Sequence, residues 1–353
     1  MITRPRPLMR LLPALAALLL AACGNPATAP LTPTPTPGRP GPAMVQVENS
    51  VLARPQSGLQ QADLVFEYLA EGGITRMTVI YFKPSGTQRI EPVRSARPVT
   101  IRLWHAYHGV IFFSGANQKV LDMISQQQIP ALTEGSDGGA YFSRDPARQA
   151  PHNLYTDGNR LAQGIDKHAP KVTYQLPVAG TPAASPAPTA ANRIVFDQTN
   201  VHKVTYTYAA ADNAYSYGTE TGPLIDHNTG QPIKPVNVIV VQVAHHNAGF
   251  TDVLGAPAVD FDLTGTGPAD VFTQGKHYSA KWDLSNPELP LKIVGADGQL
   301  MHLPAGRRRS KPHGPICSTF ARLPVACRVD RLPRWSMTIP TTGRSRSVSA
   351  RLR

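Results

Sequence analysis

Arginine side chains beside small residues are the first feature of this sequence that can do chemistry. Arg94, Ser95 and Arg97 lie within four residues, and Arg76 follows a Gly-Gly turn. A guanidinium group can hold a carboxylate or a phosphate through two parallel hydrogen bonds. Ser95 is predicted to cap a helix that begins near Pro98, and helix N-termini attract anions. Together these residues predict a small ligand-binding pocket for an anion.

The same arginines have a structural alternative. Glu67, Glu71 and Glu91 lie nearby in the sequence and can form internal ion pairs that brace loops. A structural Arg94 predicts that Arg94→Ala lowers the thermal stability, because a buried acid loses its partner. A ligand-binding Arg94 predicts weaker binding of the ligand with little loss of fold.

His152 and Asn153 form a second candidate, in a loop before a predicted helix. Histidine is the usual general base near neutral pH. With Ser95 as nucleophile and Glu71 or Asp63 as an orienting acid, His152 would complete a hydrolytic site. The alternative is that His152 braces its loop, and we favour it because the sequence has no Gly-x-Ser-x-Gly or Ser-x-x-Lys motif.

The sequence predicts neither a metal site nor a cofactor. His105 and His108 have the spacing of one helix face, but no His-Glu-x-x-His motif accompanies them. His245 and His246 would point to opposite faces of a strand. Asp226 and the histidine after it are first of all a turn. No phosphate-cradling loop and no dinucleotide fingerprint are present.

The N-terminus predicts export and a lipid anchor. Arg4, Arg6 and Arg10 precede an apolar run, residues 11–20, that is too short to span a bilayer. The following Leu20-Ala-Ala-Cys23 resembles the lipobox of bacterial lipoproteins. That resemblance implies removal of residues 1–22 as a signal peptide, lipidation of Cys23 with palmitate or a similar chain, and a location outside the cytoplasm on the cell or outer membrane. The alternative is an ordinary signal peptide that happens to contain a cysteine.

The high net charge of +12 does not belong to the body of the protein. Residues 307–353 contain eleven Arg, one Lys and one acid, whereas residues 23–306 contain 20 basic and 22 acidic residues. Nucleic acid is therefore not an expected partner. The basic tail also lacks any apolar period, and we expect it to be irregular. It can be an arm for polyanions, a loop closed by Cys317 and Cys327, or the product of a lost reading frame near Gly306, which we favour.

Composition and patterning divide the rest of the chain. Residues 23–42 are a Pro/Thr-rich stalk, which favours extended polyproline II. Residues 43–175 contain short apolar runs that predict strands, an early hairpin at Glu71-Gly-Gly, and three helices at 98–107, 117–124 and 157–168. Residues 176–192 are an Ala/Pro-rich linker.

The second half, residues 193–306, contains strand patterns and turn signals but no long helical pattern. The sequence therefore predicts an α+β fold, with an α/β-like layered N-terminal domain, followed by a mainly antiparallel β domain.

Several short motifs follow one another in order along the body of the chain: Arg54-Pro-Gln-Ser-Gly58, Ala62-Asp63, Glu71-Gly-Gly-Ile-Thr-Arg76, Pro92-Val-Arg-Ser-Ala-Arg-Pro98, Ala150-Pro-His-Asn-Leu-Tyr155, Asp226-x-x-Thr-Gly230 and Asn237-Val-Ile-Val-Val-Gln242. On these motifs the chain resembles the YerB-like bacterial lipoproteins, a two-domain family of unknown function. The resemblance implies two domains and a lipoprotein context, but no reaction. In these proteins the second domain continues past a glycine into a Trp-containing strand, whereas here Gly306 is followed by Arg-Arg-Arg-Ser.

A lipid-anchored protein without a recognised catalytic motif favours a non-catalytic role in the cell envelope. We expect the body to bind a ligand or a partner, which would be cell-wall material or an envelope protein, while Cys23 holds the chain to the membrane. A hydrolase acting on envelope glycan or peptide is the alternative. The ligand-binding residues that we expect are Arg76, Arg94, Ser95, Arg97, His152 and Asn153.

Overall fold

The structure is a computed structural model that describes residues 38–182, 187–197, 202–252, 255–306, 319–323, 336–339 and 346–349. The chain from Gly38 onward forms one compact unit. Cys23, the predicted signal peptide and most of the predicted stalk lie outside the described residues. In the part of the chain that is described, no helix is long and apolar enough to cross a membrane.

Three helices and many short strands make up the fold. The helices are α1 (Pro98–Tyr107), α2 (Gln118–Gln126) and α3 (Gly158–His168). The strands of the first half are β1 (Arg39–Pro40), β2 (Ala43–Glu48), β3 (Leu64–Leu69), β4 (Thr75–Tyr81), β5 (Arg89–Ile90), β6 (Val110–Phe112), β7 (Ala131–Leu132), β8 (Ser143–Arg144), β9 (Leu154–Asp157) and β10 (Lys171–Val172). The strands that follow are β11 (Thr189–Ala190), β12 (Arg193–Asp197), β13 (Lys203–Ala209), β14 (Ala214–Thr219), β15 (Gly222–Pro223), β16 (Ile225–Asp226), β17 (Gln231–Pro232), β18 (Asn237–Val241), β19 (His245–Thr251), β20 (Pro257–Phe261), β21 (Gly265–Thr273), β22 (Lys276–Leu284), β23 (Lys292–Gly295), β24 (Thr319–Leu323), β25 (Ser336–Ile339) and β26 (Arg346–Ser349).

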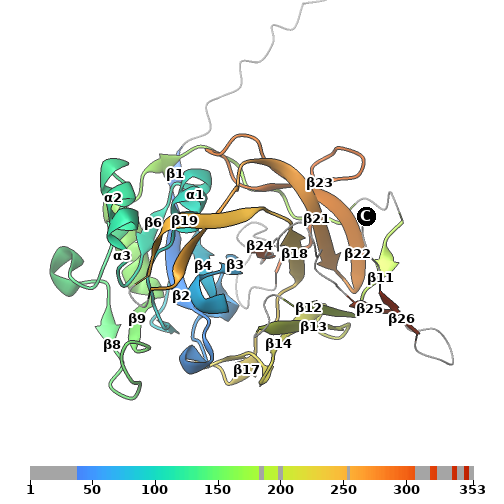
Figure 1. Ribbon diagram of the computed structural model, residues 1–353, viewed down its shortest axis with the longest axis horizontal. Helices are drawn as coiled ribbons and strands as arrows, with labels where there is room; N and C mark the ends of the chain where they lie inside the picture. Colours follow the sequence, from blue (N-terminus) through green and yellow to red (C-terminus); the bar gives the residue numbers. More distant parts are fainter. Residues whose placement is uncertain are drawn as a thin grey trace, which may run out of the picture. The chain divides into compact units, whose positions relative to one another are not determined.

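The largest sheet runs in the order β11-β22-β21-β18-β24-β3-β4-β2-β6-β7, with β23 beside β22. Figure 1 shows β2, β4 and β3 side by side. The β3–β4 hairpin turns at Glu71-Gly-Gly, as predicted, and the last two residues of this turn have φ values of 70° and 79°. Glycine takes such positive φ values without steric cost. The basic tail, expected to be irregular, contributes β24 between β3 and β18, and also β25 and β26.

The predicted helices form close to their expected ends. Asn117 and Asp157 cap α2 and α3, because each side chain accepts a backbone N–H of the first turn. The cap of α1 differs from the prediction. Pro98 occupies the first helical position, so the cap is Arg97 rather than Ser95. The Arg97 N–H donates to the Thr100 hydroxyl at 3.0 Å.

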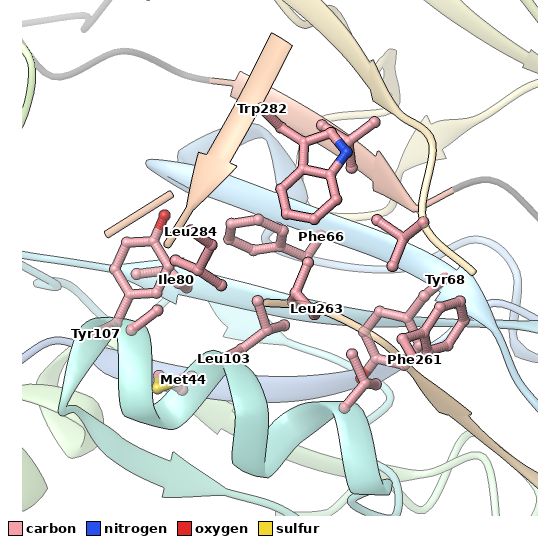
Figure 2. Close-up of a cluster of buried hydrophobic side chains, with 14 of the residues drawn as sticks. Met44, Phe66, Tyr68, Ile80, Leu103, Tyr107, Phe261, Leu263, Trp282 and Leu284 are labelled. Carbon is pink, nitrogen blue, oxygen red and sulfur yellow. The ribbon is translucent and has the colours of Figure 1, made fainter. Parts of the chain in front are cut away.

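Alternation along the central strands gives the sheet two different faces. On one face, α1 packs over Met44, Phe66 and Ile80, together with side chains from the second half of the chain. Figure 2 shows Leu103 and Tyr107 of α1 in this cluster with Trp282 and Leu284. The apolar core is thus shared by residues far apart in the sequence, which ties the two halves of the chain together.

Two of the sequence motifs meet in space. The buried Asp226 carboxylate accepts the N–H groups of Gly58 and Gln60 at 3.1 and 3.2 Å and that of Asn228 at 3.0 Å. Next to it, the His227 N–H donates to the Gln56 carbonyl at 2.8 Å. Because one carboxylate satisfies donors from both halves, we infer that it fixes the position of residues 56–60.

Replacement of this carboxylate tests its role. Asp226→Ala leaves the buried N–H of Gly58 without an acceptor and removes the part-buried hydrogen bond of the Gln60 N–H, so the free energy of unfolding falls by roughly 3 kcal/mol in urea titrations. Asp122→Ala, which removes an exposed carboxylate on α2, is the matched control and changes stability by less than about 0.5 kcal/mol. Equal effects of the two substitutions contradict the assignment.

Candidate functional site

The α1-facing side of the sheet changes from apolar to charged along the strands. In register, Met44 lies opposite Ile80, Gln46 opposite Thr78, and Glu48 opposite Arg76. Tyr68 of β3 lies on the other side of Arg76. Alternate residues of a strand share a face, so these pairs form successive rows on one side of the sheet. The last row, Glu48 and Arg76, is charged and buried and lies at the edge of the apolar core.

Glu48 gathers three neighbours around its carboxylate. The His152 ring contacts Glu48 Oε2 through Nδ1 at 2.7 Å, and Arg94 Nε lies 3.0 Å from the same oxygen. Ser50 donates its hydroxyl to Oε1 at 2.9 Å. Arg94 Nε is close enough for an ion pair but is not aligned for a hydrogen bond. Burial alone would raise the pKa of Glu48, but Arg94, His152 and Arg76 together hold the pKa below its usual value.

Arg97 is paired in the same way. Its Nε donates to Glu71 Oε2 at 2.6 Å, and its Nη1 donates to the carbonyls of Ser95 and Ala96 at 3.2 and 3.1 Å. Both Glu48 and Glu71 are buried. The structure therefore gives Arg94 and Arg97 internal carboxylate partners, as the structural alternative requires. The partner of Arg94 is Glu48, however, which was not among the expected acids Glu67, Glu71 and Glu91.

Arg76 differs from the other two arginines. Its side chain is only 2% exposed, and its Nε and Nη1 donate no hydrogen bond to any described residue. Burial, and then the nearby charge of Arg97, lower the pKa of Arg76 to about 9, although Glu48 opposes this shift. We call Arg76, Arg94 and Arg97 the arginine cluster. It brings three guanidinium groups around two carboxylates, Glu48 and Glu71.

The remaining predicted site residues, Asn153, Ser95 and His152, differ in their hydrogen-bond partners. Asn153 braces its own loop, since its side-chain oxygen accepts from Arg144 Nη1 at 2.9 Å. The Ser95 hydroxyl makes no hydrogen bond with any residue that the structure describes, His152 included. The acid that holds His152 is Glu48, whereas Glu71 pairs with Arg97 and Asp63 accepts the Phe82 N–H. The choice of Glu71 or Asp63 as the orienting acid was therefore wrong.

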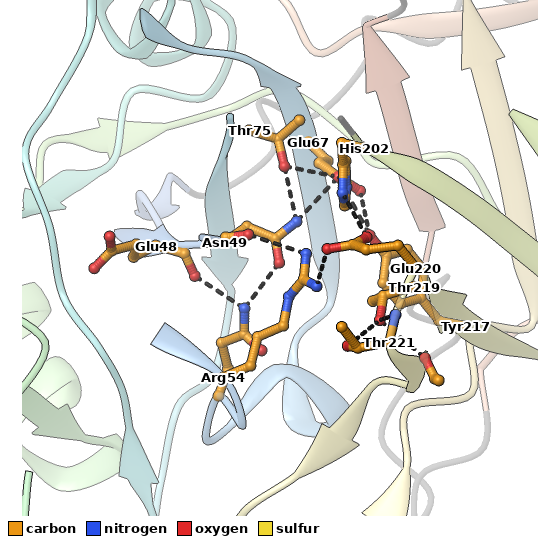
Figure 3. Close-up of polar contacts among 12 residues, drawn as sticks. Glu48, Asn49, Arg54, Glu67, Thr75, His202, Tyr217, Thr219, Glu220 and Thr221 are labelled. Atoms are coloured by element: carbon orange, nitrogen blue, oxygen red, sulfur yellow. Dashed lines mark hydrogen bonds and ion pairs between the residues drawn. The ribbon is translucent and has the colours of Figure 1, made fainter. Parts of the chain in front are cut away.

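A second buried carboxylate, Glu67, was not among the predicted site residues. It accepts hydrogen bonds from Asn49, Thr75 and Tyr217, and His202 Nε2 lies 3.3 Å from its Oε1. Figure 3 shows how this group continues through His202 and Glu220 to Arg54. A glutamate in the middle of Leu-Val-Phe-Glu-Tyr-Leu was the available sequence signal, because an isolated acid in a buried strand needs partners.

Three of the four histidines in the predicted pairs contact a carboxylate in this structure. His105 lies in the last turn of α1, whereas His108 is the left-handed C-cap and so lies outside the helix, and both contact the Glu288 carboxylate, at 2.9 and 3.1 Å. His246 lies 3.3 Å from Asp262, and the His245 ring packs against Phe261. Within the described ranges, no group of three or more His, Cys, Asp or Glu side chains has a metal-binding arrangement.

The lowered pKa of Glu48 predicts an acid-sensitive fold. A carboxyl group with a folded-state pKa below its unfolded value adds stability above about pH 4.5, and this stability is lost as the pH falls through the folded-state pKa. In urea unfolding between pH 7 and pH 3, Glu48→Gln is therefore less stable than wild type at pH 7, and its stability falls less on acidification. Glu134→Gln, at an exposed ion pair, serves as control and keeps the wild-type slope.

Comparisons with known proteins match two successive parts of the chain. Residues 30–172 match the family described as "Protein of unknown function (DUF3048) N-terminal domain", and residues 193–308 match its C-terminal domain. The protein named "Putative lipoprotein YerB" of Bacillus subtilis (strain 168) is 28% identical over 256 residues, which are 71% of this chain and 76% of that protein.

A crystal structure of the YerB protein from Bacillus subtilis superposes with a TM-score of 0.62 at 25% identity, covering 82% of this chain and 91% of that one. The matched domains account for both halves of the described body, and the resemblance seen in the motifs is confirmed. The chain therefore belongs to the DUF3048 family.

Proposed function

We propose that this protein is a lipid-anchored, extracytoplasmic binding protein that holds an anionic group of its ligand at the arginine cluster. The observation that carries the proposal is Arg76, a buried guanidinium with two N–H-bearing nitrogens that make no hydrogen bond to the described residues. A buried ion without a full set of partners costs several kcal/mol. A carboxylate or phosphate oxygen would offset this cost.

The surroundings of Arg76 favour an anion over other ligands. Arg94 and Arg97 remain 24% and 15% exposed at their side chains, so the cluster is reachable at its edge. Their partners Glu48 and Glu71 supply two negative charges against three positive ones. An incoming anion would therefore balance the charge without displacing either internal ion pair.

Binding is preferred over hydrolysis because the pieces of a nucleophilic site are not assembled. His152 has an orienting acid in Glu48, which is half of the arrangement that a general base needs. The Ser95 hydroxyl, the expected nucleophile, has no hydrogen bond to His152 in the described structure. A base without a nucleophile in reach supports a binding role for this region.

Replacing Arg76 tests the anion site. Arg76→Met removes a buried charge and keeps the volume, so the melting temperature stays unchanged or rises. Affinity for inorganic phosphate and for carboxylate-bearing muropeptides, measured by isothermal titration calorimetry, falls at least about 10-fold, as expected for a charged hydrogen bond.

Arg94→Ala is the contrasting variant, because it strips a partner from buried Glu48 and lowers stability by roughly 3 kcal/mol. A lower melting temperature for Arg76→Met with unchanged affinity of the folded protein would show that Arg76 is structural.

The anchor is tested separately. The lipobox-like segment and the name of the relative, a putative lipoprotein, support lipidation of Cys23. Metabolic labelling with palmitate marks the wild-type protein in the membrane fraction, and Cys23→Ala abolishes the label. Equal labelling of the two forms, or a cytosolic pool of full-length wild type, contradicts the anchor.

A further inference from the structure

A separate pocket lies beside the arginine cluster, where residues of both family domains meet. It has a volume of about 470 Å³, within the range of about 300–1,000 Å³ that small-molecule sites occupy. Residues 52–55 and 148–152 come from the N-terminal domain, and His227 comes from the C-terminal one. The His227 N–H that donates to the Gln56 carbonyl holds the two parts together.

Four basic side chains line this pocket, and within the described residues no carboxylate joins them: Arg54, Arg148, His152 and His227. The arginines are already engaged. Arg54 donates to Glu220 at 2.7 Å, and Arg148 donates to the carbonyls of Ala53 and Pro55 at 2.7 and 3.0 Å. Arg148 Nε also lies 3.6 Å from Glu91 Oε1, so both arginines have a carboxylate partner outside the lining and most of their donors are used.

The histidines supply the free hydrogen-bonding groups. His152 is held through Nδ1 by Glu48, which leaves the other ring nitrogen, Nε2, unbonded among the described residues. The His227 ring is exposed and makes no hydrogen bond with the described part of the chain. Because its Nδ1–H donates to the Glu48 carboxylate, His152 donates from Nε2 as an imidazolium, whereas His227 can donate from a neutral ring. In these forms both rings can hold the oxygens of an anion.

The rim of the pocket is apolar. Leu52, which lines it, is 76% exposed, and its neighbour Val51 is 55% exposed. In the described ranges only two other large hydrophobic side chains, Val178 and Leu300, are exposed. Pro55 continues the apolar wall. Exposed apolar side chains next to a polar pocket mark a place where an apolar group can be covered.

We infer that this pocket binds a carboxylate carried by an apolar group, as in the C-terminal residue of a peptide with an apolar side chain. His152 and His227 donate to the carboxylate, while Leu52 and Pro55 cover the apolar side chain. This site is distinct from the arginine cluster and does not require that cluster to bind an anion.

The test follows the ring signals of His152 and His227 by NMR while one of three probes is added: N-acetyl-alanine, N-acetyl-leucine or N-acetyl-phenylalanine. The full chain without its signal segment is used. We expect saturable shifts of both histidines at millimolar probe, larger affinity for the leucine and phenylalanine compounds, and no shift with N-acetyl-leucinamide, which lacks the carboxylate.

Substitutions distinguish binding at this pocket from binding elsewhere on the protein. His227→Ala and Leu52→Ser each weaken binding of N-acetyl-leucine at least about 5-fold, because each removes one contact from the ligand. His246→Ala, at an exposed histidine far along the chain, leaves it unchanged.

The inference is overturned if none of the three carboxylates shifts either histidine below about 20 mM, or if the amide binds as well as the acid. It is also overturned if His227→Ala binds N-acetyl-leucine like wild type. Loss of binding in Arg76→Met would mean that the ligand belongs to the arginine cluster instead.

Discussion

The buried carboxylate of Glu48 is the interaction on which the polar part of the structure depends. It ends a fully buried strand whose other residues are apolar except for Gln46, and it lies opposite Arg76 in the sheet. Removing a carboxylate from water costs several kcal/mol unless charges and donors surround it. Arg94, His152 and Ser50 meet this need, and each comes from a different segment. The loops that carry these residues are therefore held against the same strand end.

The two buried glutamates of the sheet are stabilised by different chemistry. Glu67 is surrounded by an amide, hydroxyl groups and an imidazole, which donate hydrogen bonds and define its place. Glu48 is surrounded mainly by cations. A carboxylate held by hydroxyl and amide donors can be fully satisfied inside the protein, whereas a cluster with three guanidinium groups and two carboxylates keeps an excess of positive charge. This difference is the reason that we place ligand binding at the arginine cluster around Glu48 and give Glu67 a structural role.

Sequence patterns predicted the elements better than the contacts. The hairpin at Glu71 and all three helices follow from apolar period and turn glycines, which are local properties. The helix cap was missed by two residues because Pro98 at the first position fixes the cap at Arg97. The partner of His152 lies 104 residues away, so no local pattern pointed to Glu48. The sequence did predict ligand-binding arginines in two motifs. Which of these arginines lacks a hydrogen-bonding partner depends on the strand register.

Contacts between distant segments also explain why residues of the family motifs line the pocket. Asp226 accepts backbone donors of the Arg54–Gly58 motif, and Gly58 has a φ of 86° with Ile90 and the Arg89 carbonyl packed where a Cβ would lie. A side chain at this position would push residues 54–58 away from the Asp226 turn. The same backbone fixes Pro55 and Arg54 in the pocket wall and sets His227 across from them. Motifs that look like separate turns in the sequence thus form a single structural unit, in which the glycine and the aspartate position side chains that they do not touch.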